Sequence, residues 1–523
     1  MRERILLFKD AQNGARRGSF SWDVRAAPFA LVLAALAAFG TTLGAGFVFD
    51  DFALFADPVI TSSSGWWEVW KPLQTRPLTW FSFWANFQTS GQSPWGWHLV
   101  NLLLHIAVVL LLLELLKELL PAKAALIGAA IFAVHPMLTE PVAYVFARSS
   151  MIATLGSIAA IHQWIKGKPW AALGWFFVAM LGKEECAAVP VFLLLLEFSR
   201  RRSVAWKPLG AMFGVAFALG LRTVWATTVI PGSQAGVQAG ISPLSYFAAE
   251  GEAVLRYLRM VILPWGFSVD PEIARPSAVM AVLAWGLVVA LVLVASRRFG
   301  QLREGFWFLG GLILLAPSST ILPAADLAVD RRMYLPMIAF SAVLGLLLER
   351  TNWKNSMAVV LFFAALAFHY SGLWRSPEEL WTEAVRQAPQ KLRPRIQLAR
   401  SVEPARALSI LNDAERMAPD SAAVLAEKGR VLLQLGKAGE ALGAFGRALA
   451  IDPSDARSLN NRGAALVALG QADAARADFD RALQRDPCLF DALLNLARMG
   501  AGKEIPAKCL FTAEQMSALS PMH

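Results

Sequence analysis

The chain has 523 residues, of which 56% are hydrophobic and 17% are charged, and its formal net charge is +10. This composition and a mean hydropathy of +0.47 exclude a water-soluble core for roughly the first 370 residues and indicate a polytopic membrane protein. The positive charge does not favour nucleic-acid binding, because most basic residues are dispersed between apolar segments, where membrane orientation explains them.

About eleven apolar segments are candidates for membrane spans, since a span needs about 20 apolar residues. Basic residues favour the cytoplasmic face of a membrane. Six of them precede the first segment: Arg2, Arg4, Lys9, Arg16, Arg17 and Arg25. We therefore expect a cytoplasmic N-terminus that is an uncleaved signal anchor. An odd number of spans then places the C-terminal part on the opposite face. The segments cover residues 28–48, 98–116, 122–135, 150–165, 169–182, 186–199, 208–229, 277–296, 305–322, 333–348 and 356–373.

An acidic pair, Asp50 and Asp51, follows the first segment at the point where the chain leaves the membrane. Carboxylates at a membrane face are costly and are therefore catalytic candidates. The loop that follows, through Gln74 and Trp97, is rich in Trp and Phe, which suits a lipid-linked or carbohydrate substrate. The alternative is that the two acids only cap a helix at the interface.

Farther along the chain, the stretch Ala249 to Leu263 places Arg256 and Arg259 among apolar residues. This pattern predicts a helix that lies on the membrane surface. Such a helix is either the border of a lateral entrance for a lipid or an ordinary connection between spans.

After about Trp374 the long apolar runs stop, and a 34-residue repeat begins. Asp452-Pro453 and Asp486-Pro487 lie one period apart, and Pro419 lies one period earlier. Within each unit, Gly429, Leu432, Ala441, Phe445 and Ala448 recur as Gly463, Leu466, Ala475, Phe479 and Ala482. This register predicts tetratricopeptide repeats. A degenerate unit precedes the two clear ones, from about Ser376, and a partial unit follows from Leu489.

Repeat arrays of this type usually offer a concave face to an extended polypeptide. The alternative is a domain that only stabilises the membrane part.

Cys488 and Cys509 lie 21 residues apart in the last repeat region. They form a disulfide if this side of the membrane is oxidising.

Several motifs occur in a fixed order along the chain and together suggest a family. With the appended repeats, the chain resembles the TMTC family of transmembrane, tetratricopeptide-repeat proteins, which have the GT-C fold of glycosyltransferases that use polyprenyl-phosphate sugars. We interpret the chain as a bacterial relative of this family. The motifs are Phe47-Val48-Phe49-Asp50-Asp51, Arg76-Pro77-Leu78-Thr79, Trp97 to Asn101 through His105, His135-Pro136 with Thr139-Glu140, Ala143-Tyr144 to Arg148, Met180 to Glu184, and Arg332 to Pro336.

This resemblance implies an all-α fold, with a polytopic GT-C-like helical bundle in residues 1–374 and a soluble tetratricopeptide-repeat α-solenoid in residues 375–523. It implies an inverting glycosyltransferase of the bacterial inner membrane that moves one sugar, mannose, from a polyprenyl phosphate to Ser or Thr hydroxyls. The periplasmic repeats would recruit the protein acceptor. Two alternatives stay open: a transferase that modifies a glycolipid or lipopolysaccharide, and a non-catalytic scaffold for envelope assembly.

The resemblance also assigns roles to residues. Asp50 or Asp51 would be the general base. The leaving phosphate needs a cation, and Arg332 is the first candidate because a guanidinium matches phosphate geometry. Arg331, Arg148 and Lys183 are further candidates for this role, and His135, Glu140, Arg76 and Tyr334 are candidates for orienting the substrate. Snorkelling at a span end is the alternative for the arginines. Dependence on a divalent metal is left open, because some relatives use one and others do not. The sequence contains no glycine-rich phosphate loop, which argues against a soluble nucleotide sugar as the donor.

Overall fold

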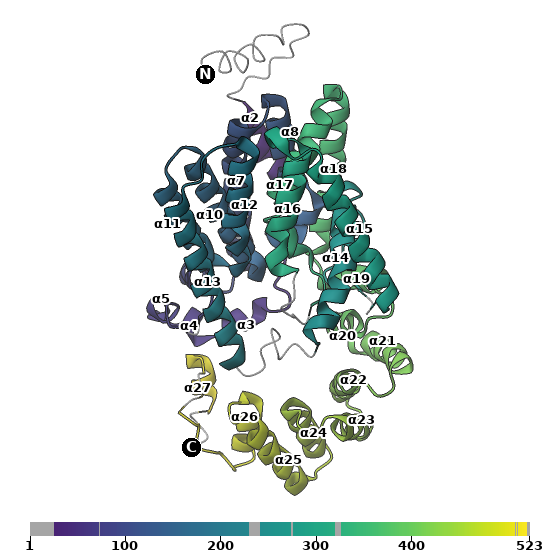
Figure 1. The fold of residues 1–523 in the computed structure, drawn as a ribbon. Coiled ribbons are helices and arrows are strands. Elements are labelled where there is room, and N and C mark those ends of the chain that lie inside the picture. Colours follow the sequence, from purple (N-terminus) through teal and green to yellow (C-terminus); the bar gives the residue numbers. More distant parts are fainter. Residues whose placement is uncertain are drawn as a thin grey trace, which may run out of the picture.

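The computed structural model describes residues 26–72, 74–229, 241–273, 276–319, 326–507, 509 and 511–519. Over these residues the chain is helical and contains no strand, which confirms the predicted all-α class. An apolar bundle stands above a curved array of shorter helices (Figure 1). The six basic residues that precede the first apolar segment lie outside the described residues, so the cytoplasmic N-terminus stays a prediction.

Each of the eleven predicted apolar segments contains a helix of the bundle. Six described stretches are long and apolar enough to cross a membrane, or seven if the bent pair Ala122–Val134 and Pro136–Ala143 is one span. This number of full-length spans is lower than eleven, because helices such as α12, with 12 residues, are shorter than the 20 or so that a span needs. The bundle helices are α2 (Ala27–Phe39, continued by the 3-10 helix η1, Gly40–Gly44), α7 (Pro94–Leu119), α8 (Ala122–Val134), α10 (Arg148–Ile165), α11 (Pro169–Gly182), α12 (Val189–Arg200), α13 (Trp206–Val229), α15 (Ala278–Ser296), α16 (Glu304–Leu315), α17 (Met337–Glu349) and α18 (Trp353–Leu373).

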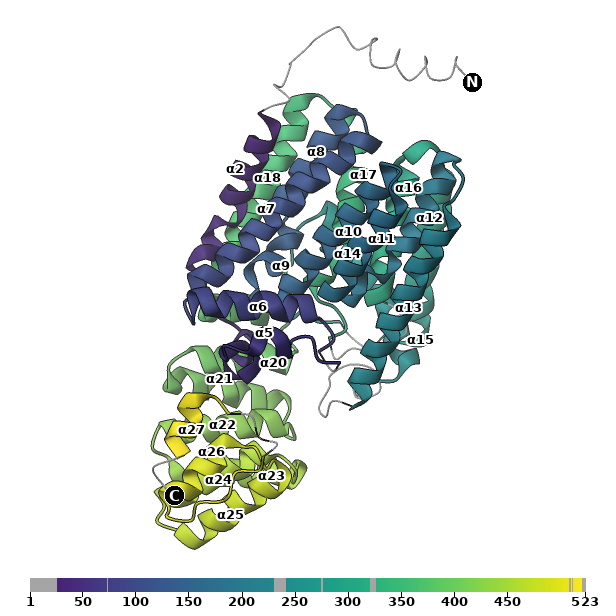
Figure 2. The same cartoon turned by 90° about the vertical axis from the view of Figure 1, so that its left-hand side faces the viewer.

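The connections between these helices contain short helices of their own. Helices α3 to α5 (Figure 1) and α6 (Figure 2) lie at the end of the bundle that faces the repeats. The predicted helix around Ala249 is present as α14, and it is tied to η8 by an ion pair between Arg256 and Asp330 at 2.7 Å. The connecting helices are α3 (Asp51–Ala56), α4 (Pro58–Thr61), α5 (Gly65–Glu68), α6 (Pro77–Ser90), α9 (Thr139–Ala143), α14 (Pro243–Ile262) and the 3-10 helices η2 (Pro136–Leu138), η3 (Val145–Ala147), η4 (Glu184–Ala188), η6 (Gly300–Leu302), η7 (Ala316–Ser318) and η8 (Asp330–Met333).

The repeat array follows α18 directly. Its predicted register is confirmed by packing: a Cβ on Gly429 would lie 2.7 Å from the ring of Phe445, and one on Gly463 would lie 2.6 Å from the ring of Phe479. Glycine is therefore required where the two helices of each unit cross. The helices are α19 (Pro377–Gln387), α20 (Leu392–Ser401), α21 (Pro404–Met417), α22 (Ala422–Gln434), α23 (Ala438–Ile451), α24 (Ala456–Ala468), α25 (Ala472–Arg485), α26 (Phe490–Arg498) and α27 (Ala513–Leu519).

The expected disulfide between Cys488 and Cys509 is present in the structure. It joins the turn before α26 to the segment that leads into α27. The third cysteine, Cys186, is free and buried. The disulfide therefore holds the segment before α27, the last described helix, against the end of the repeat array.

Small residues allow bundle helices to approach closely. A Cβ on Gly345 of α17 would lie 2.4 Å from the carbonyl oxygen of Ala124 and 3.0 Å from the backbone nitrogen of Gly128, both on α8. Helices in membranes associate mainly through such close packing, since lipid tails are as apolar as the side chains. The contact between α8 and α17 therefore depends on glycine.

We expect Gly345→Ala to destabilise the bundle by about 1–3 kcal/mol, because the added methyl group meets backbone atoms that cannot move aside. Gly286→Ala on α15 is the matched control, since no atom lies within 4 Å of its Cβ position. Thermal unfolding of the detergent-solubilised protein measures both. An unchanged melting temperature for Gly345→Ala would contradict the packing described.

Candidate active site

Asp51 is a buried residue that holds the loop after α2 in place. Its Oδ2 accepts a hydrogen bond from the backbone N–H of Val48 at 3.1 Å, and its Oδ1 accepts one from the backbone N–H of Phe146 at 2.9 Å. Burial raises the pKa of Asp51 from 3.8 to about 8, although these backbone donors lower it. Both oxygens face the protein, so Asp51 is placed to fix the loop against η3.

Asp50, in contrast, is exposed. The hydroxyl of Tyr144 donates a hydrogen bond to its Oδ2 at 2.9 Å, and the backbone N–H of Asp50 donates to the same hydroxyl at 3.3 Å. In the part of the chain that the structure describes, no donor contacts Oδ1 of Asp50. The carboxylate is thus oriented by one neighbour and has one oxygen open to solvent.

The residue before Asp50 has an unusual backbone conformation. Phe49 has φ +50°, a left-handed value that is rare for a bulky side chain and costs about 1–3 kcal/mol. Its ring lies 5.8 Å from the ring of Tyr144 and 4.5 Å from that of Trp381 on α19. Strain of this kind persists where the surrounding structure imposes it, and here aromatic contacts on both sides impose it.

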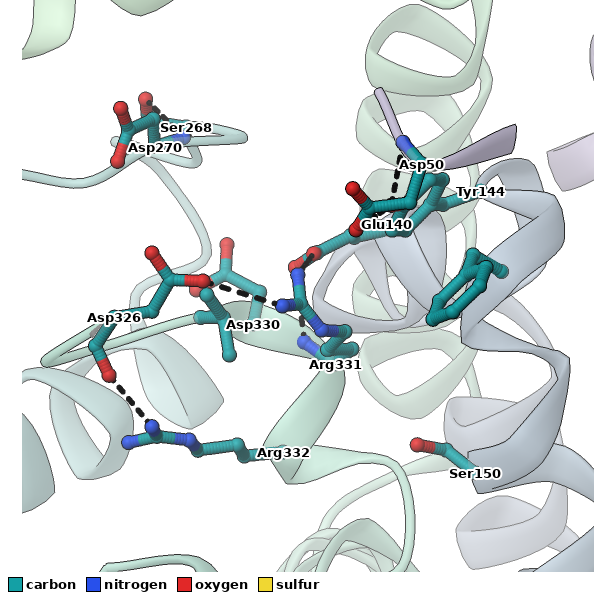
Figure 3. Close-up of polar contacts among 12 residues, drawn as sticks. Asp50, Glu140, Tyr144, Ser150, Ser268, Asp270, Asp326, Asp330, Arg331 and Arg332 are labelled. Atoms are coloured by element: carbon teal, nitrogen blue, oxygen red, sulfur yellow. Dashed lines mark hydrogen bonds and ion pairs between the residues drawn. The ribbon is translucent and has the colours of Figure 1, made fainter. Parts of the chain in front are cut away.

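Arg331 lies near Asp50, and both residues contact Tyr144 (Figure 3). Its Nη1 contacts Oε1 of Glu140 at 2.6 Å, and its backbone N–H donates to Oε2 of Glu140 at 2.9 Å. Its Nη2 lies 3.4 Å from Oδ2 of Asp326, a long contact, and its guanidinium carbon lies 5.8 Å from the centre of the Tyr144 ring. The side chain is 27% exposed. Arg331 therefore presents a fixed, partly exposed cation that shares the neighbour Tyr144 with Asp50.

Arg332 points in a different direction from Arg331 (Figure 3). It is buried, its Nη2 donates to the carbonyl oxygen of Asp326 at 2.6 Å, and its Nη1 contacts Glu250 of α14 at 3.2 Å. Arg332, the first candidate for the cation that binds the leaving phosphate, is thus placed away from Asp50. Its contacts hold the segment that carries Arg331.

A second charged group includes Arg76, Glu184 and Lys183. Nε of Arg76 donates to Oε2 of Glu184 at 2.9 Å, and both side chains are about one-third exposed. Nζ of Lys183 contacts Oγ of Ser150 at 2.7 Å and Glu185 at 2.6 Å. Burial lowers the pKa of Arg76, but Glu184 outweighs burial and holds the pKa above its usual value.

Three predicted site residues lie in the packed interior instead. Arg148 is fully buried; it donates to Oδ1 of Asn101 and Oδ1 of Asn86, both at 2.7 Å. The structure gives it no open face toward a lipid phosphate, because its charge is compensated by buried amide and carbonyl oxygens that join α6, α7 and α10.

His135 and Tyr334 are the other two predicted site residues that lie in the packed interior, and both were expected to orient the substrate. Nδ1 of His135 accepts from the backbone N–H of Met137 at 3.1 Å, and Nε2 contacts the carbonyl oxygen of Val261 at 3.1 Å. The hydroxyl of Tyr334 contacts Nδ1 of His105 at 2.9 Å. His105, His135 and Tyr334 are all buried. Their polar atoms are therefore satisfied inside the bundle and do not face the open site.

Sequence reasoning assigned no role to Tyr144 or Asp326. Tyr144 lies within one of the motifs, which was the available signal. Asp326 carries no signal, because its partners Arg331 and Arg393 are defined by tertiary contacts. A narrow crevice beside these groups is lined by Thr139, Glu140, Phe267, Ser268, Trp374 and Glu383. It lies between the bundle and α19, so the first repeat helix forms part of the surroundings of the site.

No set of three or more His, Cys, Asp or Glu side chains is arranged to hold a metal ion among the described residues.

The fold defines a class of protein: a bundle with helices of membrane-spanning length joined to a tetratricopeptide array. A family model described as TPR repeat matches residues 429–470, and one described as Tetratricopeptide repeat matches residues 456–487. These matches agree with the repeats predicted from the 34-residue period.

The chain is similar in sequence to animal protein O-mannosyl-transferases. It is 21% identical over 388 residues to one from Caenorhabditis elegans, covering 66% of this chain and 56% of the relative. It is 27% identical over 271 residues to protein O-mannosyl-transferase Tmtc2 of Drosophila melanogaster, covering 44% of this chain and 28% of the relative. The resemblance to the TMTC family is thereby confirmed, and the chain spans about half the length of these relatives or less.

A solved structure also resembles the whole chain. It is that of ArnT from Cupriavidus metallidurans bound to undecaprenyl phosphate, which is 13% identical, with a TM-score of 0.40, and covers 94% of this chain and 84% of that chain. A TM-score this low does not establish a common fold.

We expect Asp51→Asn to lower the free energy of unfolding by about 1–3 kcal/mol, because the amide NH2 would face one of the two backbone N–H groups that now donate to the Asp51 oxygens. Asp50→Asn should change it by no more than about 0.5 kcal/mol, since Asp50 is exposed. Thermal unfolding in detergent distinguishes the two variants. A larger loss for Asp50→Asn would reverse the assignment.

Asp51 should also make stability depend on pH. Between pH 3.8 and about 8 the folded chain holds a proton on Asp51 that the unfolded chain has released. The unfolded state then binds fewer protons, so the free energy of unfolding falls as pH rises through this window. Melting temperatures measured from about pH 5 to about pH 8 should fall more steeply for the wild type than for Asp51→Asn. Parallel slopes would argue against a raised pKa.

Proposed function

We propose that this protein is an inverting glycosyltransferase of the membrane surface, which moves mannose from a polyprenyl phosphate to a Ser or Thr hydroxyl of a protein. The observation that carries the proposal is the placement of Asp50. Its carboxylate is exposed and is oriented by Tyr144, whose ring also contacts the partly exposed Arg331. The similarity to protein O-mannosyl-transferases supports this reaction.

In the proposed reaction Asp50 takes the proton of the acceptor hydroxyl as its oxygen attacks C1 of the sugar. The bond between C1 and the phosphate oxygen breaks, and its electron pair leaves with the polyprenyl phosphate. One carboxylate suffices, because direct displacement inverts C1 without a covalent enzyme intermediate.

Arg331 would stabilise the charge that develops on the leaving phosphate. A guanidinium has five N–H donors, and the contacts with Glu140 and Asp326 use only part of them. Because Glu140 holds the guanidinium in place before substrate binds, little reorganisation is needed during the reaction. Arg76 and Lys183 would extend this cationic surface, while Arg332 would hold the segment from behind.

The repeat array would present the acceptor polypeptide at the same end of the bundle as Asp50. Helix α3, which begins directly after Asp50, lies at the end of the bundle that faces the repeats in Figure 1. We place this end in the periplasm of a bacterial inner membrane, with the N-terminus in the cytoplasm. The basic residues of the N-terminal segment and the disulfide of the repeat domain support this orientation.

We expect Asp50→Asn to lower the transfer rate by about 10²–10⁴-fold, the usual contribution of a general base, while folding and membrane insertion are kept. Glu68→Gln, which neutralises a carboxylate paired with Lys71 in the same loop, is the control and should retain full activity. Glycopeptide mass spectrometry of envelope proteins, with and without the chain, measures loss of one hexose from a defined protein.

Three outcomes distinguish the alternatives. Loss of hexose from a glycolipid, with no protein affected, would replace the protein acceptor by a lipid. Full activity of Asp50→Asn would remove the proposed base. No change in any glycan, together with failed envelope assembly that Asp50→Asn rescues as well as the wild type, would favour the scaffold.

A further inference from the structure

The contact between the repeat array and the bundle contains a buried carboxylate. Asp270, in the connection between α14 and α15, is 1% exposed. Its Oδ2 accepts a hydrogen bond from Nε of Arg393 at 2.6 Å, and its Oδ1 contacts Lys391. A buried carboxylate requires cationic partners. Both cations lie on the repeat side, at the start of α20, so the bundle depends on the repeat array to neutralise this charge.

Arg393 has a second partner that leads to the candidate active site. Its Nη2 contacts Oδ1 of Asp326 at 2.7 Å. The other carboxylate oxygen of Asp326 faces Arg331, and the carbonyl oxygen of Asp326 accepts from Arg332 (Figure 3). Asp326 therefore stands between one arginine of the repeat array and the two arginines near η8.

The charges around Asp326 favour its ionised form. Burial would raise the pKa of Asp326, but Arg393 and then Arg331 outweigh burial and hold the pKa below its usual value. The carboxylate is thus charged at neutral pH and can bridge the two cations. Without Arg393, one side of this bridge would be missing.

A second contact reaches the other half of the site. Trp381 of α19 packs on the ring of Phe49, the residue with the left-handed backbone directly before Asp50. The repeat array therefore touches the segment that carries the base and the segment that carries the phosphate-binding arginine. Neither contact depends on an acceptor peptide.

We propose that Arg393 is a positioning residue, which acts through Asp326 to hold Arg331 in the geometry that receives the donor phosphate. This inference rests on the proposed function, since it assumes that Arg331 binds the phosphate of a polyprenyl donor. The first repeat unit is then a structural part of the donor site. Deletion of everything after Trp374 would remove Arg393 and Trp381 as well, so it would abolish transfer even if the acceptor were a lipid.

The test compares binding of undecaprenyl phosphate by the full-length wild type, Arg393→Ala and Arg393→Lys in detergent, well below their melting temperatures. We expect Arg393→Ala to raise the Kd about tenfold, within the usual range of coupling between sites. Arg393→Lys should recover part of the loss, because an ammonium keeps the charge but contacts fewer oxygens. Arg406→Ala, which breaks an exposed ion pair with Glu378 in the same domain, is the control and should bind as the wild type does.

Asp326→Asn provides a second variant if Arg393→Ala folds poorly, since it weakens the bridge while leaving Asp270 paired. It should raise the Kd to a similar extent. A wild-type Kd for both Arg393→Ala and Asp326→Asn, even with lowered melting temperatures, would overturn the inference and leave the proposed function intact. Failure of the wild type itself to bind undecaprenyl phosphate would overturn the proposed donor, and the inference with it.

Discussion

The arrangement of the polar site depends on the ion pair between Arg331 and Glu140. Glu140 is 6% exposed, and a carboxylate this far from water is costly by several kcal/mol unless a cation pairs with it. Arg331 provides both a guanidinium N–H and its backbone N–H, so η8 must lie against α9 although 191 residues separate the partners. Tyr144, at the end of α9, is thereby placed between Arg331 and Asp50.

The segment around η8 is also held from two further directions. On one side, α14 contributes the ion pairs of Arg256 with Asp330 and of Glu250 with Arg332. On the other, the repeat array contributes Arg393, which reaches Asp326. Such partly buried pairs contribute more to geometry than to stability, because desolvation offsets much of their attraction. They fix a cation on one face of Tyr144 before any substrate arrives, which is what the proposed transfer of a phosphate-linked sugar needs.

Individual residues show how far sequence patterns could lead. Two adjacent carboxylates after an apolar segment are conspicuous in the sequence, yet the pattern favours Asp50 over Asp51 only weakly. The structure separates them by the direction of their side chains: Asp51 meets two backbone N–H groups, while Asp50 meets Tyr144. Arg148 and Tyr334 were expected near substrate because both lie in motifs that carry the family resemblance. They lie in the interior instead, where other polar groups of the bundle satisfy them.

The sequence by itself determined the apolar helices, the 34-residue register and the acidic pair at the exit of the first span. Each of these follows from local spacing, because helix faces, repeat periods and hydropathy are properties of neighbouring residues. Only the tertiary structure decided which charges meet and which are buried. Arg331, Glu140, Asp326 and Arg393 come together from four distant segments, and no local pattern encodes a contact between residues so far apart. The cost of burying an unpaired charge selects these contacts, and that cost exists only once the chain has folded.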